Sequence, residues 1–497
     1  MTRHAHGTSF LLAACFAAPG PACAQLLTDP SLVVSTYAIG FTSPSFFRFL
    51  PGTAGDLLMC EIGTGRVLHV RDGVQIGIAL DLAVAYLFER GLFGMALHPD
   101  FPATPFVYLY YTASNTGADS DQSNGALENR VSRFTWNGTQ LSGEAVLLHL
   151  PVGGSHNGGA LGFGADGMLY GSIGEAGTTM GQLQNVATGT PPNDTSILFR
   201  IRPDGSVPDD NPFVGMGGAI AKVYAYGLRN VFGLDVDPQG GGVWCTDNGA
   251  TIYDEVIKLA PGANGGWRRI AGPVARDPEG LADLWVAPGS TYVDPAFSFF
   301  QSFGITAIHF QRGDGLGAHY DGDLFVAAHN SATIYHFDVA ADRASLVMPD
   351  ASLADFVADN NTERDLVRWA SEVGVVLDLE TGPDGALYVL RFSTTAQIYR
   401  IARAATSGAG PPGAPAPRLV FAPNPFVETS RLVGGPDGFA SAAPIRIFSP
   451  SGRFVRVLPA GAAWDGRDAS GRDCASGVYH ARVGATGASV VKLATTR

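Results

Sequence analysis

Short runs of alternating apolar and polar residues recur along most of the chain, each followed by a turn and a second apolar run. One example is Phe47–Leu50, which turns at Pro51-Gly52 into Leu57–Cys60. Alternation with a period of two beside a Gly-, Pro- or Asp-rich turn predicts a hairpin, because successive strand side chains point to opposite faces. Comparable pairs of runs are 94–97 with 107–111, 161–163 with 168–172, 232–236 with 242–245, 305–310 with 323–327, and 376–380 with 386–390.

These hairpins, six in all and unevenly spaced, predict an all-β fold: a six-bladed β-propeller over residues 30–403. Closing the blades into a ring removes the sheet edges that an open β-structure must protect. We expect four-stranded blades with long inserted loops; the alternative is a pair of unrelated β-domains. The 64 glycines, 32 prolines and 15% charged residues suit a protein built of many short strands.

The pattern changes after residue 403. Residues 404–417 form a Pro/Gly/Ala linker without core-forming side chains, and strand-like runs then resume at 445–448, 455–458 and 476–483. We therefore predict a small β-sandwich over residues 418–497. This segment resembles the immunoglobulin-like FlgD-type and secretion-sorting C-terminal domains of bacterial exported proteins. The resemblance implies a contact with the cell surface or the secretion machinery.

Residues 1–24 have the pattern of an export signal. Arg3 precedes an apolar stretch at 9–18, and Ala22-Cys23-Ala24 forms a small-x-small cleavage site. Cleavage after Ala24 predicts a periplasmic, secreted or cell-surface protein. In the alternative, Leu12–Cys15 is a lipoprotein cleavage box, which would leave a lipid anchor on Cys15.

Composition excludes several classes of function. The formal net charge of −13 argues against nucleic acid or an anionic membrane surface as a partner. The three cysteines beyond the signal, Cys60, Cys245 and Cys474, have neither disulfide-framework nor zinc-ligand spacing. The sequence also lacks a phosphate-binding loop, a zinc-protease helix and a nucleophile elbow.

Polar residues that could take part in catalysis or binding precede two of the predicted strands. His156 lies in the run Ser155–Gly159, and a histidine suits a general base because its ordinary pKa is near neutrality. Arg229 and Asn230 precede a later strand and can hydrogen-bond carbonyl or carboxylate oxygens. Taken alone, the first motif is equally compatible with a structural histidine, and the second with a salt link between blades.

A third motif follows on an acidic loop. Asp254 and Glu255 lie close to Gly249 and Ala250, and carboxylate and carbonyl oxygens are the ligands that calcium prefers. We expect these four residues to form a metal site; the alternative is an acidic surface loop.

Taken in order, and with the stretch Glu89–Phe101, these motifs resemble the glucose/sorbosone dehydrogenase family over residues 41–401. The resemblance implies a six-bladed propeller that binds pyrroloquinoline quinone (PQQ) and calcium and oxidises aldoses at the anomeric carbon. It implies that His156 takes the proton of the sugar hydroxyl while hydride passes to the quinone. It also implies that Arg229 stabilises charge on the quinone oxygen.

The resemblance assigns further roles residue by residue. Asn230 would contact the cofactor beside Arg229, and Glu175 would orient the histidine at the edge of the cofactor site. Glu89 stands where the sugar dehydrogenases usually carry a glutamine, also next to the cofactor. The carbonyls of Gly249 and Ala250 would bind the cofactor-side calcium.

The sequence departs from the family where the cofactor's carboxylates need cations. Val375 and Leu377 replace two arginines and Asn330 replaces a lysine; each lost charge-assisted hydrogen bond is worth about 1.5–3 kcal/mol. Two functions are therefore open: a PQQ-dependent dehydrogenase of a sugar or other alcohol with an unidentified electron acceptor, or a non-catalytic propeller that binds a glycan or a protein. A substitute cation such as Arg391 or Arg368 in the central pocket would favour the dehydrogenase.

Overall fold

The computed structural model describes residues 26–177, 179–393 and 395–404. Beyond them it describes residues 420–422, 430–433, 445–449, 454–459, 462–475, 477–483 and 490–495. The described chain is almost entirely strand and loop, with one short α-helix, α1 (Asn361–Leu366). Its 3₁₀ turns are η1 (Gln182–Gln184), η2 (Val214–Met216), η3 (Gly218–Lys222), η4 (Val274–Arg276), η5 (Pro278–Asp283), η6 (Ala318–Tyr320) and η7 (Ala351–Leu353).

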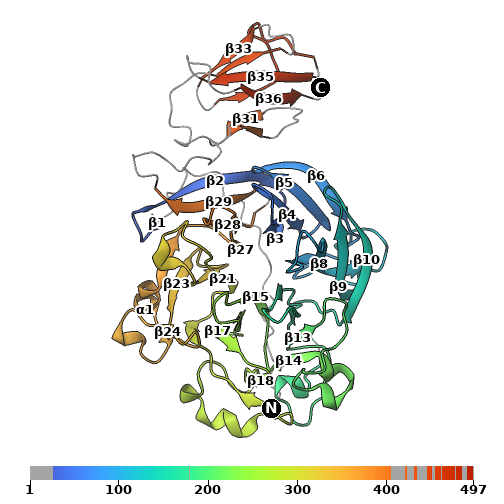
Figure 1. Cartoon of the computed structure of the whole chain (residues 1–497), viewed down its shortest axis with the longest axis vertical. Helices are drawn as coiled ribbons and strands as arrows, with labels where there is room; N and C mark the ends of the chain where they lie inside the picture. The colour runs from blue at the N-terminus through green and yellow to red at the C-terminus, as the bar shows by residue number, and fades with distance from the viewer. Residues whose placement is uncertain are drawn as a thin grey trace, which may run out of the picture.

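Residues 26–403 form six sheets set around one axis (Figure 1). Three sheets have four strands each. The first contains β3 (Pro44–Phe49), β4 (Asp56–Glu61), β5 (Arg66–Arg71) and β6 (Val74–Asp81). The second contains β7 (Leu92–Leu97), β8 (Phe106–Ser114), β9 (Ala126–Trp136) and β10 (Leu141–Leu150). The third contains β27 (Val376–Thr381), β28 (Leu387–Arg391), β29 (Ala396–Arg403) and β2 (Leu32–Phe41).

The other three sheets are larger. One contains β11 (Leu161–Phe163), β12 (Leu169–Ile173), β13 (Ile197–Ile201), β14 (Val223–Tyr226), β18 (Ala263–Asn264) and β19 (Thr291–Tyr292). The next contains β15 (Val231–Val236), β16 (Val243–Asp247), β17 (Ile252–Leu259), β20 (Phe297–Gln301) and β25 (Val357–Ala358). The last contains β21 (Ile305–Phe310), β22 (Leu324–Ala328), β23 (Ile334–Val339), β26 (Arg368–Ser371) and β1 (Leu26–Leu27), with β24 (Leu346–Val347) beside β23.

The sheets close into a ring. Their first strands contact one another in the order β3, β7, β11, β15, β21 and β27, and β27 contacts β3 again. The N-terminal strand β2 pairs with β29 from Leu32↔Arg403 to Phe41↔Ala396, which joins the two ends of the region. The all-β propeller expected from the sequence is confirmed.

The expectation of four-stranded blades throughout is wrong for the three larger sheets. Their long insertions return to the sheet and add short edge strands, such as β18 and β19 in parallel register beside β14. Such additions satisfy backbone groups that a four-stranded edge would leave open. Two-residue strands carry no alternating pattern long enough to be seen in the sequence.

A β-bulge interrupts the start of five first strands, at Pro44/Phe47, Leu92/Gly94, Val231/Gly233, Ile305/Ile308 and Val376/Asp378. A bulge bends the strand and re-aims the side chains beside it. The loops that precede these bulges all lie at the same end of the ring, which we call the loop face. His156, before β11, lies on this face.

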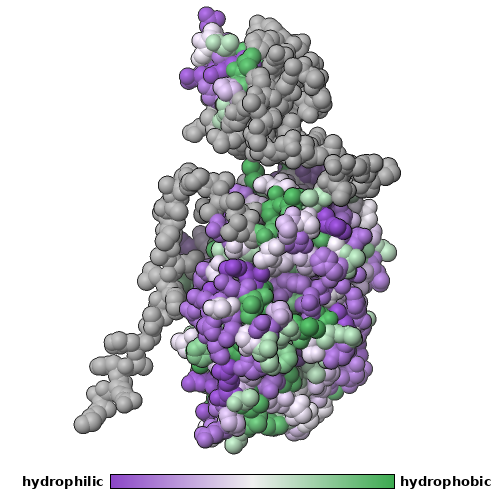
Figure 2. All heavy atoms as spheres, turned by 90° about the vertical axis from the view of Figure 1, so that its left-hand side faces the viewer, coloured by the Kyte–Doolittle hydropathy of each residue, from purple (hydrophilic) through white to green (hydrophobic). Residues whose placement is uncertain are grey.

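Apolar side chains fill the space between neighbouring sheets. The fully buried Tyr108 of β8 and Phe199 of β13 belong to one such cluster, and Trp244 of β16 and Phe310 of β21 belong to another. The outer side of the molecule in Figure 2 mixes hydrophilic and hydrophobic residues without a continuous apolar band. The scaffold that holds the loop face is therefore rigid and close-packed.

Cys60 and Cys245 are free and buried and Cys474 is free and half-buried, so no disulfide joins them. Among the described residues no helix is long and apolar enough to cross a membrane.

The C-terminal tail contains two small sheets. One is made of β30 (Val420–Ala422), β31 (Ser430–Val433) and β34 (Ala463–Trp464), and the other of β33 (Phe454–Leu458), β32 (Ile445–Phe448), β35 (Gly477–Val483) and β36 (Val490–Thr495). Trp464 of the first sheet packs edge-on against Tyr479 of the second at 4.9 Å. The predicted immunoglobulin-like, FlgD-type identity stays a prediction. The predicted signal at 1–24 and nearly all of the linker at 404–417 lie outside the described residues.

Candidate functional site

Glycines allow the loop that carries His156 to pass close to the neighbouring strand β12. A Cβ atom on Gly158 would lie 2.7 Å from the carbonyl oxygen of Ser172, and Gly158 has φ +67°. Only glycine fits so close to the end of β12. His156 itself has φ +56°, a conformation that is uncommon outside glycine and often found at functional sites.

His156 is held on three sides. Its backbone N–H donates to Glu89 Oε2 at 2.6 Å, and its Nδ1 lies 2.9 Å from Glu175 Oε1. Its Nε2 lies 3.3 Å from Arg229 Nη2. A carboxylate that accepts from Nδ1–H leaves Nε2 as the nitrogen able to take a proton. The arrangement has the geometry of an oriented general base.

Glu175 connects the histidine to two further side chains. Its Oε2 accepts a hydrogen bond from Trp267 Nε1 at 3.0 Å, and Arg229 Nε lies 4.0 Å from its Oε1. Burial works to raise the pKa of Glu175, but the hydrogen bond and charge of His156 and the charge of Arg229 outweigh it and lower the pKa. Glu175 is therefore ionised and stabilises a positive charge on His156.

Arg229 and Asn230 are fixed by a buried carboxylate at the end of β16. Their backbone N–H groups donate to Asp247 Oδ2 and Oδ1 at 2.8 and 2.6 Å. Burial raises the pKa of Asp247 to about 6, although these two hydrogen bonds act in the opposite direction. Arg229 Nη1 also donates to the carbonyl oxygens of Asn248 and Gly249 at 2.8 and 2.9 Å.

Three buried polar atoms of this cluster have no hydrogen-bond partner within the described part of the chain: Arg229 Nε, Asn230 Oδ1 and Asn248 Oδ1. A buried polar group without a partner is costly, so such groups are normally paired. Their presence on loops that meet at His156 fits a site built for a polar ligand.

Each of the four predicted metal ligands can be followed through its contacts. The carbonyl of Gly249 accepts from Arg229, and Ala250 is exposed. Asp254 accepts from the N–H groups of Gly249, Phe303 and Gly304 at 3.0, 2.7 and 2.7 Å. This carboxylate ties the loop to the start of β21.

Glu255 accepts from the N–H of Gly272 at 2.6 Å. Burial raises the pKa of both Asp254 and Glu255. Their carboxylates therefore stabilise backbone conformation, and the calcium site expected at Gly249, Ala250, Asp254 and Glu255 stays a prediction.

Among the described residues, one group of at least three His, Cys, Asp or Glu side chains has its ligand atoms within 4.8 Å of one another: Asp323, His336 and Asp338. Asp323 precedes β22 and Asn330 follows it, so this group lies at the end of the ring opposite the loop face.

The positions that lack family cations do lie on the loop face. Asn330 is exposed and bonds to His329 Nδ1, Val375 is half-buried, and Leu377 is buried within the bulge of β27. Arg391 ends β28 opposite Val376 on the same face.

Arg391 is not free, however. Its Nη1 donates to Tyr399 Oη at 3.2 Å, and its side chain passes beside Gly374. Arg391 is therefore a cation of the loop face that is already bonded to a tyrosine.

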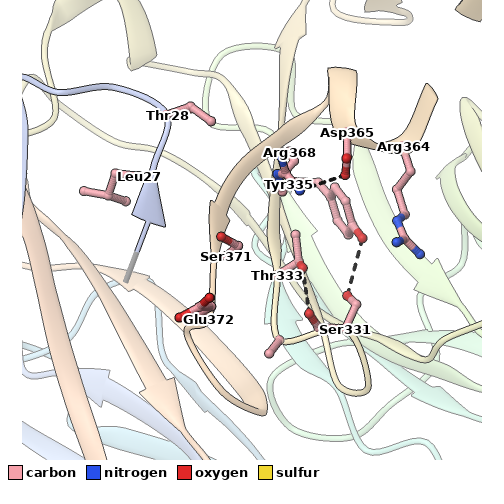
Figure 3. Close-up of a pocket in the computed structure, with 11 residues that line it drawn as sticks. Leu27, Thr28, Ser331, Thr333, Tyr335, Arg364, Asp365, Arg368, Ser371 and Glu372 are labelled. Atoms are coloured by element: carbon pink, nitrogen blue, oxygen red, sulfur yellow. Dashed lines mark hydrogen bonds and ion pairs between the residues drawn. The ribbon is translucent and has the colours of Figure 1, made fainter. Parts of the chain in front are cut away.

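Arg368 is elsewhere. It pairs with Asp365 at 2.9 Å and lines a cavity of about 450 Å³ between β1, β23 and β26 (Figure 3). The other lining residues are Leu27, Thr28, Ser331, Ala332, Thr333, Tyr335, Arg364, Ser371 and Glu372. None of the predicted catalytic or cofactor-binding residues lines this cavity.

Sequence reasoning missed Trp267 and Asp247 as site residues. Neither is among the predicted site residues, because neither a tryptophan nor a buried aspartate reveals its hydrogen-bond partner in the sequence. Their roles depend on contacts across the ring: Trp267 to Glu175, 92 residues apart, and Asp247 to Arg229.

The chain is similar to known proteins in sequence and in fold. The profile of the family described as Glucose / Sorbosone dehydrogenase matches residues 41–400. An uncharacterized protein of Synechocystis sp. is 29% identical over 383 residues, covering 73% of this chain and 84% of that protein. Aldose sugar dehydrogenase YliI of Escherichia coli K12 is 24% identical over 402 residues, covering 79% and 95%. The solved PQQ-bound form of aldose sugar dehydrogenase from Streptomyces coelicolor gives a TM-score of 0.54 at 24% identity, covering 74% and 98%, and shares the fold.

Proposed function

Because the chain belongs to the glucose/sorbosone dehydrogenase family, we propose that it is an exported quinoprotein that oxidises the anomeric hydroxyl of an aldose, or a related alcohol, with PQQ and calcium. The observation that carries the proposal is the convergence of His156, Glu175 and Arg229 beside buried polar atoms that lack partners. The curated relative named an aldose sugar dehydrogenase and the solved PQQ-bound relative support the substrate class and the cofactor.

In this proposal the chain supplies a base, a positioning acid and an electrostatic clamp. His156 Nε2 takes the proton of the substrate hydroxyl, and the ionised Glu175 stabilises the imidazolium that forms. Arg229, stacked 5.5 Å over the Trp267 ring, offers positive charge beside Nε2. PQQ, when bound, supplies the two-electron acceptor.

The residues fit the quinone end of the cofactor better than its carboxylate end. Arg229 and Asn230 hold atoms without partners and would contact the quinone. Calcium would be held by the carbonyls of Gly249 and Ala250. Glu89 is committed to the His156 N–H and acts as a positioning residue in this proposal.

A second function is favoured by one observation. Asn330, Val375 and Leu377 give the loop face no cation at three positions where the resemblance expects them. Without tight quinone binding, the same face would serve a non-catalytic propeller that binds a glycan or a protein partner.

Dye reduction separates the two functions. Purified protein with PQQ and calcium should reduce an artificial electron acceptor when an aldose is added, and calorimetry should show quinone binding. Calorimetry without quinone binding at high calcium, together with no dye reduction, would leave the binding protein as the function.

We propose the export of the protein and the limits of its domains from the sequence pattern. Cleavage after Ala24 gives a mature chain beginning at Gln25, with the propeller at 30–403, the linker at 404–417 and a sorting-type domain at 418–497. N-terminal sequencing of the exported protein decides between Gln25 and a lipidated Cys15.

A further inference from the structure

An exposed aromatic residue lies next to the candidate base. Phe88 is 59% exposed on the loop between β6 and β7, and Tyr86 on the same loop is 37% exposed. The residue after Phe88 is Glu89, whose carboxylate accepts the His156 N–H at 2.6 Å. Exposed aromatic side chains offer apolar area and a ring face to a ligand, and these two stand on the loop that ends at Glu89.

The backbone of Phe88 strengthens the case. Its φ is +63°, a left-handed conformation that a bulky residue rarely adopts. Strain of this kind persists where surrounding contacts over-determine the backbone, and it gathers at functional sites.

The loop is fixed on both sides of Phe88. Tyr86 N–H donates to Ser120 O at 2.9 Å, and Arg90 Nε donates to Gly153 O at 2.7 Å. The carbonyl of Glu89 accepts from Asn157 Nδ2 at 3.0 Å. The fold therefore holds Phe88 in a strained conformation on a loop whose next residues, Glu89 and Arg90, bond to the loop that carries His156.

The rim around His156 has a second aromatic wall. Trp267 is half-buried and bonds Glu175, and the Tyr86 ring packs against Gly63, where an added Cβ would meet it at 3.3 Å. Aromatic walls with a few placed polar groups are typical of small-molecule sites. A pyranose offers such a site C–H groups on its ring faces and hydroxyls at its edge.

We propose that Phe88, supported by Tyr86, is the aromatic platform on which the sugar ring of the substrate packs while its hydroxyl reaches His156 Nε2. This inference rests on the proposed function and names the residue that recognises its substrate class. Phe88 is a substrate-binding residue in this view; Tyr86 contributes less because its ring already packs on Gly63.

Four variants test the platform. Phe88→Ala removes the ring, Phe88→Trp keeps an aromatic ring, and Phe88→Gly removes the ring while relieving the left-handed backbone. Phe356→Ala is the matched control, because Phe356 is also exposed (37%) and also left-handed (φ +59°) but lies at the outer edge of the β15 sheet, beside β25.

Binding of d-glucose and maltose is measured by saturation-transfer NMR on the full chain with calcium and PQQ but no electron acceptor, so that turnover stops. We expect Phe88→Ala and Phe88→Gly to weaken sugar binding about 3–10-fold, and Phe88→Trp and Phe356→Ala to retain it. In dye assays the same variants should raise KM more than they lower kcat. If Phe88→Gly keeps its stability, its weaker sugar binding is due to the missing ring and not to unfolding.

Equal sugar binding by the natural protein and Phe88→Ala, an equal loss in Phe356→Ala, or no sugar binding at all would overturn the platform. Sugar binding that depends on Phe88 in a protein without dye reduction would sustain the platform and refute the dehydrogenase instead.

Discussion

Two sides of the same ring differ in chemistry while sharing architecture. On one side, the loops around β11, β12, β15 and β16 bring together His156, Glu175, Arg229 and Asp247. On the other side, the loops around β21, β22, β27 and β28 present Asn330 and Val375 at comparable positions. β15 and β27 even share a bulge near their first residues.

The difference teaches that the repeated hairpin sets only where a residue lies on the loop face. The side chains just outside the strands decide what that position does. The first side has buried charges that satisfy one another and buried polar atoms without a hydrogen-bond partner in the described chain. The second has uncharged side chains at 330, 375 and 377 and an arginine, Arg391, that is already bonded to Tyr399. The predictions below test this contrast, from the largest effect to the smallest.

The largest effect is expected from His156→Ala. Loss of the base should lower kcat with aldose by roughly 10²–10⁴-fold, while the circular dichroism spectrum and Tm stay near those of the natural protein. His149→Ala is the control, since His149 is exposed and pairs with Glu128 away from the site. Dye reduction that survives in His156→Ala would show that His156 is not the base and that the first side does not carry the catalysis.

Glu175→Gln should cost less activity, roughly 10²-fold or below, because it disturbs the base without removing it. The loss should fall on kcat rather than KM, because Glu175 Oε1 lies 2.9 Å from Nδ1 of the base. A purely structural role would lower the amount of folded protein and leave kcat per folded molecule unchanged.

The same variant has a pH-dependent effect on stability. The pKa of Glu175 is lowered in the folded protein, so its ionised form stabilises the fold above the ordinary pKa of 4.5. That contribution disappears as pH falls through the lowered value. Glu175→Gln should therefore destabilise the protein at pH 7 and have little effect well below pH 4.5, as measured by thermal unfolding at each pH. Equal loss of Tm at both pH values would contradict this assignment.

Val375→Arg tests the uncharged side. Val375 is half-buried just before β27, so an arginine there can reach the loop face and should tighten PQQ binding about 3–10-fold in calorimetry. Leu377→Arg is the contrasting variant: Leu377 is 5% exposed beside Asp378, which already pairs with Arg48 at 2.7 Å. That arginine would bury a charge and lower Tm. Unchanged affinity in Val375→Arg would show that position 375 does not face the cofactor.

The sequence predicted the inner hairpin of each sheet because alternation there spans enough residues to be read, as in Val376–Thr381 and Leu387–Arg391. It missed the added edge strands, since two-residue segments such as Ala263–Asn264 pair only through tertiary contacts. The β-bulges could not be predicted from the sequence either, because a register shift depends on the partner strand.

For the site, motif order pointed to His156, Glu175 and Arg229, which the structure brings close to one another. It also grouped Asp254 and Glu255 with calcium, and that site stays a prediction. Exposed acidic loops and buried acidic anchors look alike in sequence, and backbone N–H groups donate to both carboxylates. Which carboxylate faces a ligand depends on burial, and a sequence without its fold does not reveal burial.

The smallest effect is expected from removing residues 418–497. The contrast between the two sides assumes one closed ring, and that ring is complete before the tail begins: β2 pairs with β29 as far as Leu32↔Arg403, and Ala404 N–H donates to Ser31 O at 2.7 Å. The truncated protein should therefore keep its Tm within about 2 °C and change location more than stability. Truncation at residue 395 is the control, because it deletes β29 and leaves both β2 and β28 with an unpaired edge; this variant should unfold or aggregate. If loss of the tail alone melts the propeller, the ring depends on contacts beyond Arg403 and its closure by β2 is insufficient.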